Sequence, residues 1–133
     1  MQGDFSLQIG RFVERTKART DTVIRKVGAE VLRSVVLKSP VDTGRFRANW
    51  VVSYGPTTMT VTGLDPSGIE AINRGLRLIQ LMNPGQDELW ISNSLPYARR
   101  LEYGWSGQAP AGMVRITLAQ FRSFMSRAVR ELG

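Results

Sequence analysis

The sequence predicts an α+β fold in which a small antiparallel sheet is flanked by helices. Three observations predict it: a long amphipathic stretch opens the chain, two short alternating runs follow, and a second amphipathic stretch closes it. A parallel βαβ fold is disfavoured, because a tight turn joins the first two predicted strands. The length of 133 residues, 42% of them hydrophobic, fits a single domain over 1–133.

The first predicted helix runs from Phe5 to Lys38, and Pro40 prevents its continuation. Apolar residues recur on one side at helical spacing; they are Ile9, Val13, Ile24, Val27, Val31 and Val35. The opposite side carries a basic stripe, which consists of Arg11, Arg15, Arg19, Lys26 and Arg33. Such a helix would extend about 45 Å. That is long for a small domain, so we expect a neighbouring subunit along part of it.

A β-hairpin is predicted after the first helix. Asn49–Tyr54 and Thr58–Thr62 both alternate in polarity, and Gly55-Pro56 forms the turn between them. In the second strand we expect Met59 and Val61 to be buried.

Four further elements follow along the chain. Asp65-Pro66 is predicted to open a helix, with Asp65 as its cap, and this helix ends at Asn83. Glu88–Asn93 is predicted to be a strand beside the hairpin, and Tyr97–Tyr103 a short helix. The terminal helix is predicted over Met113–Leu132. Its apolar face is expected to contain Val114, Leu118, Phe121, Met125, Ala128 and Leu132.

The composition argues against an enzyme. The chain has no histidine and no cysteine, which excludes Ser-His-Asp and Cys-His catalysis, disulfides and the usual zinc sites. It contains no glycine-rich phosphate loop, and its acidic residues are scattered. We therefore expect no catalytic residue, no cofactor and no metal. An enzyme acting on peptidoglycan or nucleic acid would depend only on acids such as Glu102.

The charge balance favours nucleic acid or an acidic protein surface as a partner, and a basic protein without a special partner is the alternative. Eighteen Lys and Arg residues outnumber eleven acids, and the net charge is +7. The basic stripe would suit contacts to DNA phosphates, which are independent of sequence; an ordinary solvated helix face is the alternative. No apolar run reaches the roughly 20 residues of a membrane span, and no apolar signal segment follows the first residues. We expect an intracellular product without a membrane partner.

Two segments have the composition of a protein interface, since they mix aromatic residues, arginine and turn residues. They are residues 42–50 and 95–106. The candidates for a subunit interface or a lumen are Arg45, Arg47, Tyr97, Arg99, Arg100 and Glu102, with Glu102 paired to one of the arginines. Tyr97 is alternatively a core residue. Asp42, Thr43 and Gly44 are interpreted as shaping the backbone. Charge reversal at Arg47 or Arg100 is expected to block assembly while the fold survives.

At these segments the chain resembles a known family. Residues 39–48 (SPVDTGRFRA) resemble the SPVDTGxLRxS signature, and residues 93–104 (NSLPYARRLEYG) resemble the N-x-x-x-YAxxLExG segment. Both belong to the neck or tail-completion family of tailed phages, to which the minor tail protein Z of lambda is related. The two motifs cover about a sixth of the chain and occur in the family's order. The helical stretch over residues 65–83 is a departure, since many relatives have a shorter connection there.

The resemblance implies a structural virion protein of the head–tail junction, assembled in the host cytoplasm. It implies a homo-oligomeric ring, with a hexamer expected, between the head-closure or connector proteins and the tail terminator or tail tube. Viral double-stranded DNA would pass through its lumen. The alternative function is that of a sequence-independent nucleic-acid-binding protein.

Overall fold

A computed structural model describes residues 5–9, 20–41, 43–82, 88–96, 116–117 and 119–131. In chain order its elements are β1 (Phe5–Gln8), α1 (Thr20–Lys38), α2 (Arg45–Ala48), β2 (Trp50–Ser53), α3 (Ile69–Gln80), β3 (Trp90–Asn93) and α6 (Phe121–Glu131). The strands form one antiparallel sheet in the order β1-β3-β2. The predicted α+β class is therefore confirmed.

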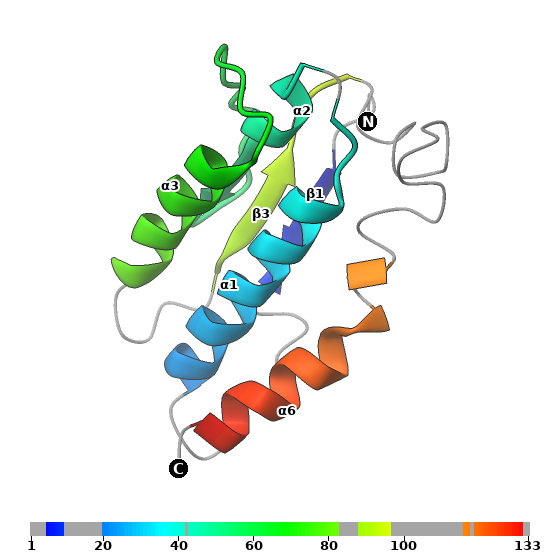
Figure 1. Ribbon diagram of the computed structural model, residues 1–133. Helices are drawn as coiled ribbons and strands as arrows, with labels where there is room; N and C mark the ends of the chain where they lie inside the picture. Colours follow the sequence, from blue (N-terminus) through cyan, green and yellow to red (C-terminus); the bar gives the residue numbers. More distant parts are fainter. Residues whose placement is uncertain are drawn as a thin grey trace.

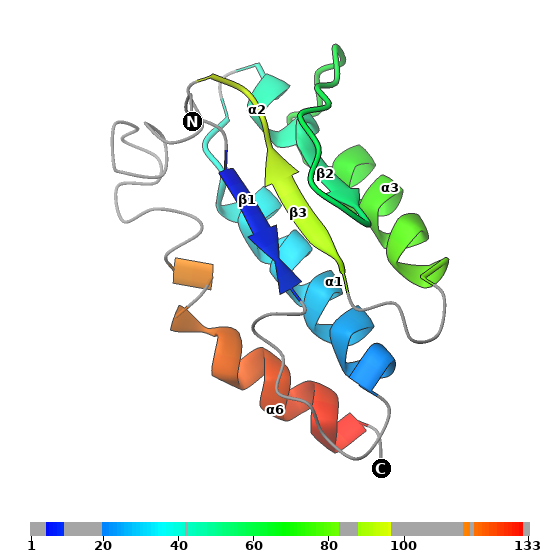
Figure 2. The same ribbon diagram turned by 180° about the vertical axis from the view of Figure 1, so that it is seen from behind.

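Helices α1 and α3 lie side by side across one face of the sheet (Figure 1). Helix α6 packs against α1 on the side away from α3, as both views show (Figures 1 and 2). Helix α1 is thus the central element of the helical layer. The predicted apolar positions Ile24, Val27, Val31 and Val35 of α1 are all buried.

The strand register decides which side chains meet the helices. Trp50 pairs with Asn93, and Val52 pairs with Ile91. Paired residues lie on the same face of a sheet, and Trp50, Val52 and Ile91 belong to the hydrophobic core together with α1. Asn93 is fully buried among them, and its Nδ2 donates to the Phe46 carbonyl at 3.0 Å. The core therefore lies between the sheet and the helical layer.

The prediction of one helix from Phe5 to Lys38 is wrong at its beginning. Residues 5–8 form β1, which pairs with β3, and the helix begins at Thr20. Phe-Ser-Leu-Gln alternates apolar and polar residues, which is the period of a strand, and pairing with β3 satisfies the backbone groups on one side of it. Ile9 is buried, and its amide donates to the Leu89 carbonyl at 2.7 Å. The 19 residues of α1 extend only about 28 Å, so helix length no longer argues for a neighbouring subunit.

The predicted hairpin is also wrong in its second strand. β2 pairs with β3, and Thr58–Thr62 belongs to no strand. Met59, which was expected to be buried, is 51% exposed. At the start of β2, a hairpin partner would compete with Arg74 on α3, because its Nη2 donates to the Trp50 carbonyl at 3.1 Å and to the carbonyl of Ala48, at the end of α2, at 2.8 Å.

The remaining predicted elements agree with the structure where it describes them, apart from their ends. α3 begins at Ile69 with Gly68 at its N-cap, so the prediction that Asp65 is the cap is wrong in position. The Asp65 carboxylate still accepts from the amides of Gly68 and Ala71 at 3.2 and 2.9 Å, and the latter lies in the first turn of α3. β3 is confirmed beside β2. α6 begins at Phe121, with helical residues also at 116, 117 and 119. The short helix Tyr97–Tyr103 lies outside the described residues.

Candidate functional site

Residues 39–50, here called the corner, join the end of α1 to α2 and β2. Gly44 turns the chain with φ +92°, a left-handed conformation that a side chain would strain. A Cβ at this position would also lie 2.7 Å from the Asp65 carbonyl carbon. The Gly44 carbonyl accepts from the amides of Ala48 and Asp65, both at 3.0 Å. The interpretation of Gly44 as shaping the backbone is confirmed, and the corner thereby holds the start of α3.

Arg47 connects the corner to both helices. Its Nε donates to the Ser39 carbonyl at 3.1 Å, and its Nη2 donates to the Leu37 carbonyl at 3.0 Å. Its Nη1 donates to the carbonyls of Pro66 and Ser67 at 3.1 and 3.3 Å. The carbonyls of Leu37 and Ser39 lie at the end of α1, where the last carbonyls of a helix have no amide of the same helix to accept from. The guanidinium is thus used within the chain, whereas Arg45 beside it is exposed.

Two further side chains complete the corner. Trp50 is fully buried, and its Nε1 donates to the Ser39 hydroxyl at 2.8 Å, while its ring meets Phe46 edge to face at 5.9 Å. The Asn49 side chain donates to the carbonyls of Arg45 and Val61 at 2.8 and 3.0 Å. It also accepts from the Val61 amide at 2.7 Å. Residues 42–50 were expected to form an interface, but the side chains of Arg47, Asn49 and Trp50 in this segment make their hydrogen bonds within the chain.

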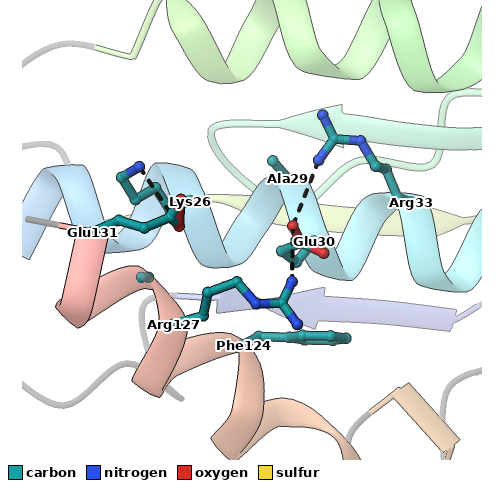
Figure 3. Close-up of a pocket in the computed structure, with 8 residues that line it drawn as sticks. Lys26, Ala29, Glu30, Arg33, Phe124, Arg127 and Glu131 are labelled. Carbon is teal, nitrogen blue, oxygen red and sulfur yellow. Dashed lines mark ion pairs between the residues drawn. The ribbon is translucent and has the colours of Figure 1, made fainter.

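A pocket of about 190 Å³ lies on the other side of the molecule, between α1 and α6 (Figure 3). Glu30 of α1 lies between two arginines, at 3.8 Å from Arg33 Nη1 and 3.5 Å from Arg127 Nη1. Lys26 lies 3.8 Å from Glu131. Three cations against two carboxylates leave this cluster at +1. The pairs are long and half-exposed, so each contributes at most about 1 kcal/mol, and the cations stay accessible to other anions.

The pocket includes two of the five predicted DNA-facing residues. Lys26 and Arg33 line it, whereas Arg11, Arg15 and Arg19 lie outside the described residues. Sequence reasoning missed Arg127. The sequence carries no signal for this position, because the contact with α1 is marked by Phe124 and Ala128 of α6, whose burial comes from the fold. Arg127 is next to Ala128 on the helix and so borders that contact. The basic surface is thus formed by Lys26 and Arg33 of α1 together with Arg127 of α6.

In the described part of the chain, five of the six exposed large apolar side chains lie at or near α3. Met59 and Leu64 precede the helix, Ile69 begins it and Leu81 follows it; their exposure ranges from 51% to 72%. Leu37 of α1 is 54% exposed and follows Val36, which contacts Gly68 just before α3. We call these five residues the α3 border. Exposed Arg77 lies on the same helix. Apolar side chains interspersed with arginine are typical of protein interfaces.

Four predicted interface residues, Tyr97, Arg99, Arg100 and Glu102, lie outside the described residues, as does Asp42. In the part that the structure describes, no group of three or more acidic side chains is placed to hold a metal ion. Nor is any helix in this part both long and apolar enough to cross a membrane. No protein-family model, curated protein or solved structure matches the chain.

Proposed function

We propose that this chain is a structural, non-catalytic virion protein that forms a ring at the head–tail junction of a tailed phage. The observation that carries the proposal is the separation of two kinds of surface. Exposed apolar side chains border α3, and the cations Lys26, Arg33 and Arg127 line the pocket between α1 and α6 (Figure 3). Helices α3 and α6 lie on opposite sides of α1 (Figure 1). Among the exposed large apolar residues that the structure describes, Val129 on α6 alone departs from this separation.

A ring around DNA requires two such surfaces. Contacts between subunits favour apolar side chains with arginine, and a lumen through which DNA passes favours positive charge without base recognition. The resemblance of residues 39–48 and 93–104 to the neck or tail-completion family supports the same function. On this proposal the neighbours are head-closure or connector proteins on one side and the tail terminator or tail tube on the other. A hexamer is the expected ring, assembled in the host cytoplasm and retained in the virion.

The test is the native mass of the purified chain, alone and with its connector and tail neighbours. We expect a discrete ring, either from the chain alone or on contact with one neighbour. A chain that stays monomeric in every mixture and is missing from purified virions would contradict the proposal.

The alternative is a free nucleic-acid-binding protein, which the cluster of Lys26, Arg33 and Arg127 favours. It predicts tight binding of the isolated subunit to duplex DNA at physiological salt. Replacing each of these cations with Gln should then lower the slope of log K against log salt by about 0.9. The ring proposal predicts weak binding by the isolated subunit, so a salt titration separates the two functions.

A further inference from the structure

Residues 57–62 (TTMTVT), here called the threonine arm, have the sequence of a strand without its pairing. Threonine and valine favour strands, and no charged residue occurs between Tyr54 and Leu64. In the structure the arm belongs to no strand. The segment that joins β2 to α3 reaches beyond α2 in both views (Figures 1 and 2). It therefore presents a β-prone, uncharged backbone at the surface.

One side of the arm is attached to its own chain. The Asn49 carboxamide bonds both the amide and the carbonyl of Val61, as a neighbouring strand would. The Ser94 hydroxyl donates to the Thr57 carbonyl at 3.4 Å. In an extended strand, successive residues direct their backbone groups to opposite sides. The backbone groups of Thr58, Thr60 and Thr62 would therefore face away, and all three residues are exposed.

The arm has no place in its own sheet. Arg74 binds the start of the outer edge of β2, as described above, and the other edge belongs to β1, on the far side of β3. Among the described residues no strand lies beyond β1. β1 also lacks the lysine, glutamate or proline that natural edge strands use against pairing. Within the part of the chain that the structure describes, one molecule thus has a strand-like sequence outside the sheet on one side and β1 as the outermost strand on the other.

We propose that the threonine arm of one copy adds as a strand to the outer edge of β1 in a second copy. This inference rests on the proposed homo-oligomeric ring and names a contact within it. Addition to a sheet edge provides main-chain hydrogen bonds without needing complementary charges. The two surfaces differ and lie on opposite sides of the sheet, so the contact is head-to-tail. Contacts of that kind generate a closed ring when the rotation between subunits closes.

The absence of cysteine from the chain makes cross-linking a direct test. The full chain carrying both Thr60→Cys and Ser6→Cys is treated with a short bismaleimide reagent, with each single variant as a control. We expect the double variant to give a ladder of covalent oligomers and the single variants to remain uncross-linked. Efficient dimers from Thr60→Cys alone would mean that two arms pair with each other, which would overturn the proposal. The absence of a ladder from the double variant would also overturn it.

Proline provides an independent test, because it removes the amide at position 60. The matched variant Thr60→Ala removes the same hydroxyl and keeps the amide. Position 60 is exposed and outside the core, so both variants should melt at the same temperature as the parent chain. We expect Thr60→Pro to weaken ring formation by roughly tenfold and Thr60→Ala to leave it unchanged.

The two proposals fail in different ways. Suppose that the parent chain forms a ring, but that the double variant does not cross-link and Thr60→Pro assembles normally. In that case the arm contact is wrong and the proposed function stands. If the parent chain is monomeric in every mixture, both proposals fail.

Discussion

Arg47 and Gly44 hold the corner in two different ways, one by hydrogen bonds and one by backbone conformation. Arg47 donates to four carbonyls from the end of α1 and the approach to α3. Gly44 permits a turn that brings its carbonyl to the Asp65 amide. Neither role needs a partner molecule. The turn residues of the corner can be recognised in the sequence. The carbonyls that the Arg47 guanidinium reaches cannot, because some of them lie about 20 residues away and are brought close only by the fold.

Arg47→Lys should lower the free energy of unfolding by about 1–3 kcal/mol, because an ammonium group cannot reach four carbonyls in the plane of a guanidinium. Arg47→Glu should be worse, since it leaves those carbonyls beside a negative charge. This differs from the expectation that charge reversal at Arg47 spares the fold. Urea denaturation measures the effect. Arg45→Gln, at the exposed neighbouring arginine, should change the midpoint little, and an equal loss at both positions would contradict the assigned role.

Gly44→Ala should destabilise the fold by about 1–3 kcal/mol, because alanine is strained at φ +92° and its Cβ would press on the Asp65-Pro66 backbone. Gly55→Ala is the matched control, since nothing lies within 4 Å of a Cβ at that position. Thermal melting of both variants provides the comparison. Equal melting temperatures would show that the corner adapts to a side chain.

The helices, whose pattern lies within their own residues, can be predicted from the sequence. The strands depend on partners far away in the sequence and are harder to predict. The apolar positions of α1 and α3 recur at helical spacing, so their sequences alone indicate them. β1 was assigned to a helix because its strand partner, β3, lies more than 80 residues away. The threonine arm was assigned to a hairpin because its alternation is that of a strand. The sequence carries no sign that Arg74 binds the start of β2.

The same limit applied to the contact between α1 and α6. Ala128 was expected on the apolar face of the terminal helix and is buried, but Phe124 was missed. Both lie in the core cluster with α1. The arginine next to that line completes the pocket with Glu30. The basic stripe was therefore found on one helix only, because the sequence does not show which face of α6 meets α1.

Phe124→Ala should lower the free energy of unfolding by about 3–5 kcal/mol, since the ring is 92% buried against the core. Val129→Ala, on the same helix but 42% exposed, should lie within about 0.5 kcal/mol of the parent. Chemical denaturation followed by circular dichroism separates the two. If both substitutions were tolerated alike, α6 would not be packed on α1 in solution.

At the scale of the molecule, the α3 border and the basic pocket between α1 and α6 have opposite effects on the association of subunits. The α3 border is apolar, so its exposure favours association at low concentration. The cations of α1 and α6 repel one another between copies unless an anion lies between them. Subunits should therefore contact one another through the α3 border and leave the pocket between α1 and α6 accessible.

The variant with both Leu64→Ser and Ile69→Ser should fold normally and fail to form the ring, because both side chains are more than half exposed and lie in the α3 border. Val129→Ser is the control, since it also removes an exposed apolar side chain, but from the α6 side. Sedimentation velocity measures the outcome. Loss of the ring in the control alone would place the subunit interface on α6 instead.

The central position of β3 has a consequence for synthesis of the chain. Both other strands precede β3 in sequence, and each pairs only with it. On the ribosome, β1 and β2 must therefore wait until residue 93 has emerged from the exit tunnel before any sheet forms. Non-local pairing of this kind slows folding and leaves β-prone segments exposed in the meantime. During this interval the exposed segments of β1 and β2 are the kind of surface that holding chaperones bind, and a ribosome paused before β3 would present them without this sheet.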